Sequence, residues 1–305
     1  MIATIAAQQV LSLRRQRTFV ALLTTLLVMT SLAGVLGWLS HNTITRVYND
    51  AVSLLAADGQ PAPPNPFELK PTLSLLSNMV VYIPLIGALV ALVLGHLAMA
   101  DDQSDGVARL VFTRGASRMS YVGGKVLGAA AVLAVVLAAS LVVSAVSLVV
   151  VNQAVPTLSD LGRLVLFYAL SWLYLFMFAL VGMVTVLVTR RRSLALLAGL
   201  GVWLVVTYAV PQFASGLRPS ASLSPISDPV GTSQTFFQIT SHVRPFSVTE
   251  QYRSAAAQVL RTAAPEPLAD SVLRVLPNLV AVAVLLVLAA VLVRRHDYSA
   301  GASDE

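Results

Sequence analysis

The 305-residue sequence contains no cysteine, and this absence removes several classes of function at once. Disulfide bonds, thiolate catalysis and cysteine-based metal sites are excluded. The four histidines are scattered, and they form no His-Glu-x-x-His zinc pattern. The sequence also lacks a Gly-x-Ser-x-Gly nucleophile pattern. We therefore expect neither a catalytic nor a metal site on this chain, and no resident cofactor.

Charged residues are scarce as well. They make up 11% of the sequence, whereas hydrophobic residues make up 57%. An ordinary soluble domain is nearer a quarter charged. A soluble protein of this length would need polar surface that this chain lacks, so the composition indicates a membrane protein.

Six apolar runs of about 20 residues predict an all-α, polytopic fold with six transmembrane helices in one transmembrane domain, residues 1–305. Pro211 ends the fifth run, and Pro277 fits the first turn of the sixth. The first run is longer than the apolar part of a signal peptide, so we interpret it as a retained helix. The predicted spans are residues 19–39, 79–100, 126–151, 164–189, 194–210 and 275–293.

The distribution of arginine and lysine predicts the orientation of these spans. An even number of spans places both termini on one side. The segments on that side hold 12 of the 20 basic residues, although they are shorter in total than the segments on the other side. The positive-inside rule makes this side cytoplasmic. The net charge of +6 then lies on the cytoplasmic face. Topology and anionic lipid explain that charge without a nucleic-acid partner.

The predicted spans contain no Asp, Glu, Lys or Arg. Ion-coupled carriers usually keep such groups at membrane depth, so this absence argues against a secondary carrier. His96 is the one histidine in the spans, near the cytoplasmic end of the second. We interpret it as an interfacial or inter-helix hydrogen-bonding residue. The lack of intramembrane charge favours an apolar or amphipathic substrate, or no substrate.

Three segments outside the predicted spans have recognisable patterns. Residues 1–17 favour an interfacial helix, with a frayed terminus as the alternative. The outer segment 40–78 contains the proline-rich run GQPAPPNPFELKP and is expected to be an exposed connector. In the outer segment 211–274, Ser247 and Glu250 form a capping-box pattern before an amphipathic helix predicted at 248–262. This segment either caps the membrane part or meets an external partner.

The cytoplasmic segment 101–125, DDQSDGVARLVFTRGASRMSYVGGK, has a distinctive spacing. Asp102 precedes Gly106, and Ser117 and Arg118 follow that glycine at plus eleven and plus twelve. A Gly-Lys pair, Gly124 and Lys125, closes the segment. Charge alone would allow a solvated loop that satisfies the positive-inside rule.

The GGK tripeptide at the end of this segment superficially suggests a phosphate loop. A Walker A loop requires a glycine five residues before the Gly-Lys pair and a Ser or Thr after it. Met119 and Val126 occupy these positions. We therefore expect no nucleotide site on this chain.

This spacing, after the second span of a six-span protein with both termini inside, resembles the permease subunit of a type-2 ABC transporter. In that family the segment forms a coupling helix that packs against a separate ATP-hydrolysing subunit. Leu110 and Phe112 would supply an apolar anchor, and the flanking charges would fix the register. The resemblance assigns Gly124 and Lys125 to the start of the third span. It places at the ATPase interface Asp101, Asp102, Asp105, Gly106, Arg109, Leu110, Phe112, Arg114, Ser117 and Arg118.

The resemblance implies a non-catalytic permease subunit of an exporter, coupled through residues 101–118 and located in the plasma membrane. Two ATPase subunits would carry ATP and Mg, and a second permease copy or a homologue would complete the complex. Two alternatives remain open. One is a mechanotransmitting subunit that acts on an external protein through residues 211–274 without moving a substrate. The other is a secondary carrier or a membrane enzyme.

Overall fold

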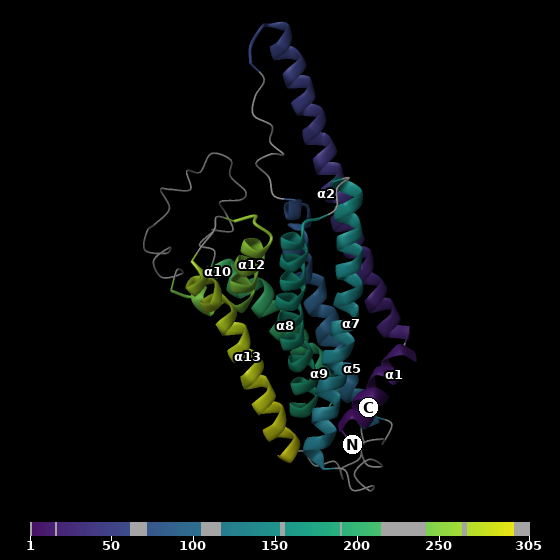
Figure 1. Cartoon of the computed structure of the whole chain (residues 1–305). Helices are drawn as coiled ribbons and strands as arrows, with labels where there is room; N and C mark the ends of the chain where they lie inside the picture. Colours follow the sequence, from purple (N-terminus) through teal and green to yellow (C-terminus); the bar gives the residue numbers. More distant parts are fainter. Residues whose placement is uncertain are drawn as a thin grey trace.

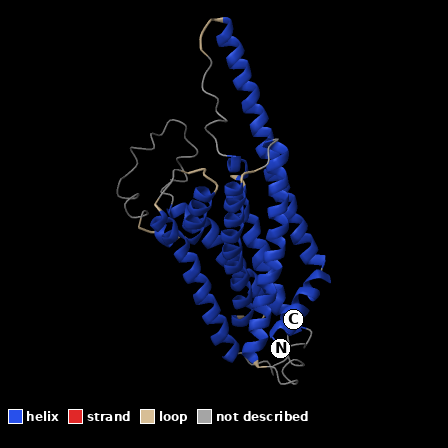
Figure 2. Ribbon diagram, in the orientation of Figure 1, coloured by secondary structure: helices blue, strands red, loops and turns tan. Residues whose placement is uncertain are grey.

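The computed structural model describes residues 2–15, 17–61, 72–104, 117–152, 156–189, 191–214, 242–263 and 267–295. These ranges contain helices and turns but no strand (Figure 2). The elements are α1 (Ile2–Arg15), α2 (Arg17–Ala57), η1 (Thr72–Leu76), α4 (Met79–Tyr82), η2 (Ile83–Gly87), α5 (Ala88–Ser104), α7 (Arg118–Asn152), α8 (Leu158–Val188), α9 (Arg192–Leu204), η3 (Val205–Ala209), α10 (Val210–Ala214), η4 (Arg244–Phe246), α12 (Val248–Val259) and α13 (Leu268–Arg295).

Six helical stretches of the described chain are long and apolar enough to cross a membrane, which confirms the predicted all-α fold with six spans. They are Leu23–Ala57, Leu73–Ala100, Arg118–Val151, Leu158–Val188, Arg192–Gln212 and Leu273–Arg294. The second and fifth stretches each include a π-helix, η2 and η3 respectively. A π-helix is rare and often marks a functional part of a helix.

Several helices extend beyond the spans predicted from hydropathy. α2 continues to Ala57, so the first part of the predicted outer segment 40–78 is helical and projects beyond the other helices (Figure 1). The fifth span continues past Pro211 to Ala214. Pro277 lies inside α13, which begins at Leu268, and not in its first turn. The first-turn assignment of Pro277 was therefore wrong, because the turns before it are amphipathic and not apolar throughout.

The central helix of the bundle is α8. Its first turn has a capping box, in which the Thr157 side chain accepts from the backbone N–H of Asp160 and the Asp160 carboxylate accepts from that of Thr157. α8 packs against α5, α7, α9, α12 and α13, and its aromatic side chains Phe167, Tyr174 and Phe178 are fully buried. The core of the protein therefore forms around this helix.

α5 and α8 cross with their backbones in direct contact at two glycines. A Cβ atom added to Gly95 would collide with the carbonyl oxygen of Ala179. A Cβ atom added to Gly182 would collide with the carbonyl oxygen of Leu92. Small residues let membrane helices approach this closely, and the close approach supplies the van der Waals contact that holds them together.

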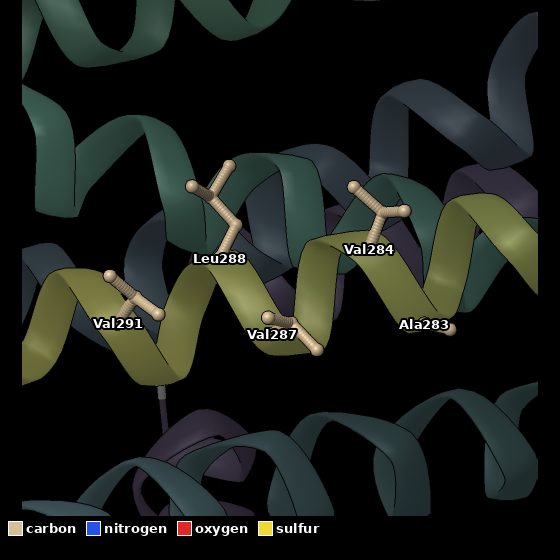
Figure 3. A pocket seen from close by; sticks show the side chains of 5 residues that line it. All are labelled: Ala283, Val284, Val287, Leu288 and Val291. Atoms are coloured by element: carbon tan, nitrogen blue, oxygen red, sulfur yellow. The ribbon is translucent and has the colours of Figure 1, made fainter.

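α13 has a long apolar face that no described helix covers. Its exposed side chains border a groove of about 390 Å³ (Figure 3). In a bilayer such a face contacts lipid chains, so exposure of these residues is expected for a span at the edge of the bundle. The residues that line the groove are Ala283, Val284, Val287, Leu288 and Val291.

The two ends of the bundle differ in composition. At one end lie the start of α7, the start of α9 and the end of α13 (Figure 1). Arg118, Arg191, Arg192 and Arg294 belong to these helix ends, and Arg118 is hydrogen-bonded to Arg294. We call this the arginine-rich end, and α1 lies beside it. α10, α12 and the start of α13 lie toward the other end, which we call the α12 end (Figure 1). That the arginine-rich end faces the cytoplasm remains a prediction.

The close contact between α5 and α8 predicts that a methyl group added at Gly182 destabilises the protein, whereas one added at Gly201 does not. Gly182→Ala should lower the free energy of unfolding by about 1–3 kcal/mol, because α5 must move away from α8. Gly201→Ala is the matched control, since nothing lies within 4 Å of its added Cβ atom. Thermal unfolding of the two purified variants in detergent measures the difference. Equal melting temperatures would show that the crossing does not limit stability.

Candidate functional site

Ser117 caps the helix that follows the predicted coupling segment. Its Oγ atom accepts a hydrogen bond from the backbone N–H of Ser120 at 3.1 Å and donates to the Ser120 hydroxyl at 2.8 Å. The Tyr121 N–H bonds to the Ser117 carbonyl at 3.0 Å. Serine is a favoured N-cap because its side chain satisfies an N–H of the first turn. The serine of the Ser-Arg pair therefore fixes the start of α7.

Arg118, the first residue of α7, reaches across to the last turn of α13. Its Nη1 atom donates a hydrogen bond to the Arg294 carbonyl oxygen at 2.9 Å. The last carbonyls of a helix have no partner within that helix, and the helix dipole places partial negative charge there. A guanidinium is well suited to this position. Arg118 thus ties the end of the predicted coupling segment to the sixth span.

Lys125 is buried two turns after the start of α7. Its side chain is 6% exposed, and its Nζ atom donates to the Oε1 atom of Gln9 at 2.5 Å. Nζ also lies 5.8 Å from the centroid of the Tyr121 ring, within the range of a cation–π contact. Gln9 belongs to α1 and is 3% exposed. This contact joins the N-terminal helix to the third span.

Close packing of α1 on α7 accompanies the Lys125–Gln9 hydrogen bond. A Cβ atom added to Gly128 would come within 2.8 Å of both Cβ and Cγ of Gln9. Gly128 lies one turn after Gly124, which is also buried. The glycine-rich start of α7 therefore provides the space into which the Gln9 side chain fits.

The structure describes only part of the predicted interface. Asp101 and Asp102 lie in the last turn of α5. Ser117, Arg118, Gly124 and Lys125 come together with α1 and the end of α13 at the arginine-rich end. The remaining predicted residues lie outside the described ranges: Asp105, Gly106, Arg109, Leu110, Phe112 and Arg114.

The sequence did not point to Gln9 as a site residue, although its position held a signal. Gln9 lies four residues after Ile5 and four before Leu13, so it falls on the apolar face of the predicted N-terminal helix. A polar side chain on such a face needs a polar partner when it is buried. Lys125 is that partner, but its identity depends on how α1 packs against α7.

The described polar contacts at the arginine-rich end are hydrogen bonds at the start of α7 and from α7 to α1 and α13. Among the described residues, no group of three or more His, Asp or Glu side chains could hold a metal ion.

The buried Lys125–Gln9 contact predicts coupled effects of substitution. Lys125→Met and Gln9→Leu should each lower the free energy of unfolding by about 1–3 kcal/mol, because each removes a hydrogen bond between two buried side chains. The double variant should be destabilised less than the sum of the two. Chemical unfolding of all four proteins in detergent gives the coupling energy. Strictly additive effects would show that the two side chains do not act as a pair.

One comparison with known proteins covers nearly the whole chain. Residues 3–298 match the family described as ABC-2 family transporter protein. No curated protein matches the chain. The family is that of membrane transport subunits, which are generally non-catalytic and associate with an ABC ATPase subunit. With its six apolar helices and this match, the chain is a multi-pass membrane protein that belongs to the ABC-2 transporter family.

Proposed function

We propose that this chain is the permease subunit of an ATP-driven exporter, coupled to its ATPase through residues 101–118. One observation carries the proposal: Arg118, at the end of this segment, is hydrogen-bonded to the last turn of α13. Lys125, two turns later, is bonded to α1. An ATPase that binds this segment and moves it would therefore displace the third span, the sixth span and the N-terminal helix together.

The proposed complex contains two ATPase subunits and a second membrane subunit, either another copy of this chain or a homologue. ATP and Mg would bind to the ATPase subunits. ATP binding would draw these together, and the two membrane halves would rock against each other, which is a common form of switching transition. In this arrangement, displacement of the arginine-rich end by the ATPase subunits would move the spans of this chain.

The buried side chains of the spans favour an apolar or amphipathic substrate. Lys125 is the one charged side chain among the described residues that is buried, and it is bonded to Gln9 near the arginine-rich end. The other buried polar side chains of the described spans are neutral, apart from His96. His96 is ionisable and lies near the arginine-rich end of α5. A strongly charged substrate would meet few opposite charges along the described part of the bundle.

A mechanotransmitting subunit is the second candidate. The second half of α2 projects beyond the other helices, and its side chains include the exposed Val47 and Leu54 (Figure 1). These features favour contact with an external protein. Replacing the exposed Val47 and Leu54 with aspartate would separate the candidates, because both side chains lie on the projecting part of α2. Loss of partner binding with intact ATPase coupling would favour mechanotransmission. Transport that persists without ATP would instead indicate a secondary carrier.

Co-purification with an ATPase subunit tests the proposed coupling. A tagged chain extracted in mild detergent should retain an ABC ATPase. Leu110→Ala should lower its capture at least about tenfold, since apolar anchors dominate such interfaces. Met119→Ala is the matched control, because Met119 is exposed at the same end of the bundle. The proposal fails if no ATPase co-purifies, or if the two variants capture it equally.

A further inference from the structure

α12 packs along the first half of α8 and brings polar side chains against it. The two helices are antiparallel, because residue numbers rise along α12 as those of their α8 partners fall. α12 also contacts α4, η3 and α13. The hydrogen-bonded pairs between α12 and α8 are Thr249 with Tyr174, Tyr252 with Ser171, and the Val259 carbonyl with Arg163.

The contact between Thr249 and Tyr174 lies within the thickness of the membrane. Tyr174 follows the first residue of α8, Leu158, by 16 residues, and it precedes the last, Val188, by 14. These separations correspond to about 24 and 21 Å along the helix. The hydrocarbon core is about 30 Å thick. Polar groups of α12 near Thr249 therefore lie close to the middle of a membrane-spanning helix.

Arg253 is a cationic side chain close to this contact. It follows Thr249 by four residues and so lies one turn along α12 on the same face. Its guanidinium interacts electrostatically with the phenol groups of Tyr174 and Tyr252. The residue is half-buried, and its buried Nε–H has no hydrogen-bond acceptor among the described residues. No described carboxylate forms an ion pair with it. The described part of the chain thus supplies no anionic partner for this charge.

The hydroxyl groups around Arg253 already use their protons within the protein. Thr249 donates to a backbone carbonyl of η3 at 2.9 Å, so Tyr174 is the donor in its 2.9 Å contact with Thr249. Ser171 donates to a carbonyl of its own helix at 2.8 Å, so Tyr252 is the donor to Ser171. A hydroxyl has only one proton to donate. Neither tyrosine is therefore available to donate to an incoming anion.

Thr207 is a second polar group without a partner beside Tyr174. It lies in η3 directly after Val206, whose carbonyl accepts from Thr249. Its side chain is 2% exposed, and its Oγ1 atom makes no hydrogen bond within the described chain, although it lies near the Tyr174 hydroxyl. A buried hydroxyl normally has a partner, since burial without one is costly. Thr207 and Arg253 are thus unsatisfied donors near the same phenol, on different elements.

These two donors match the chemistry of an anionic headgroup. A guanidinium binds phosphate and carboxylate groups through charge-assisted hydrogen bonds, and a hydroxyl adds one further donor. A charge at membrane depth is costly unless it is paired, so an anion at Arg253 would offset that cost. A free anion would have to leave water to reach this depth, whereas an amphipath brings its own apolar chain. The site therefore favours an anion that carries an apolar tail.

We propose that Arg253 and Thr207 bind the anionic headgroup, a phosphate or a carboxylate, of an amphipathic ligand within the membrane. The bonds from α12 to α8 and η3 hold Arg253 in place, and binding requires no movement of α12. The proposal deepens the proposed function and rests on it in one respect, because the ligand would be the substrate of the exporter.

Binding of dodecyl phosphate to the purified full chain in maltoside detergent tests the site without any ATPase. Arg253→Gln should weaken binding at least about tenfold and Thr207→Val at least about threefold, because each removes a donor to the anion. Arg261→Gln is the matched control, since Arg261 is an exposed arginine two residues after the end of α12. Calorimetric titration gives the affinities. Without ligand, Arg253→Gln should melt no lower than the unaltered chain, because it loses an unpaired charge.

Three results of this titration would overturn the site. One is equal affinity of Arg253→Gln and Arg261→Gln for dodecyl phosphate. Another is equal affinity of the unaltered chain for dodecyl phosphate and for dodecanol, its neutral match. The third is competition by inorganic phosphate as tight as that by dodecyl phosphate, which would indicate a free anion as the ligand. Thr207→Val, which is similar in shape to the residue it replaces, keeps the test decisive if Arg253→Gln does not fold.

The complex with its ATPase tests whether the ligand is a substrate. Dodecyl phosphate should raise the rate of ATP hydrolysis in complexes of the unaltered chain and of Arg261→Gln, and this stimulation should be lost in Arg253→Gln. Binding without stimulation in an intact complex would overturn the substrate role. If no ATPase joins the chain, the coupling proposal fails, and the titration of the purified chain decides the site alone.

Discussion

The close crossing of α5 and α8 is the constraint on which the rest of the structure depends. Their backbones touch at Gly95 and Gly182, where a single methyl group would not fit. In a bilayer the solvent is as apolar as the side chains, so helices associate through close contact and inter-helix hydrogen bonds. The crossing fixes α8 in the centre, and the other spans are positioned by the faces that α8 leaves available.

α8 makes side-chain hydrogen bonds on two of those faces. Toward α7, Tyr168 bonds to the carbonyl of Ser140, and Trp172 bonds to the carbonyl of Ala130. Toward α12, two hydroxyl pairs and a bond from the Arg163 guanidinium to the carbonyl of Val259 make the contact. α8 thus makes hydrogen bonds to helices on both of these faces. α13 connects α12 to the arginine-rich end, where Arg118 holds its last turn.

Hydropathy was sufficient to predict six spans, because an uncharged apolar run of about 20 residues matches the thickness of a bilayer and is rare in soluble proteins. It misjudged the ends of helices wherever polar residues continued a helix. Residues 40–50 were expected to belong to an exposed connector, yet α2 continues through them to Ala57. The capping pattern at Ser247 predicted the start of α12 correctly, whereas the helix ends at Val259 and not at residue 262. Its antiparallel register on α8 could not be predicted, since residues 171 and 252 are distant in sequence.

In the predicted coupling segment, residue spacing and the family resemblance singled out Ser117 and Arg118, and their place at an ATPase interface stays a prediction. The folded chain shows what these side chains bind, which is the first turn of α7 and the last turn of α13. Gln9 was missed because its role emerges only when α1 packs on α7. The resemblance places Arg118 at the ATPase interface as well, and its bond to α13 gives that position a route to the sixth span.

The central claim is that Arg118 passes movement from the proposed coupling segment to α13. Because the chain has no cysteine, spin labels can be attached to Leu158→Cys at the start of α8 and Thr262→Cys just after α12, both exposed. Electron-paramagnetic-resonance distances between these labels would be measured with saturating ATPase subunit, before and after ATP–vanadate trapping. The account predicts a longer, broader distance after trapping, and loss of that change in Arg118→Gln. A distance that trapping leaves unchanged, or a change that Arg118→Gln leaves intact, would contradict it.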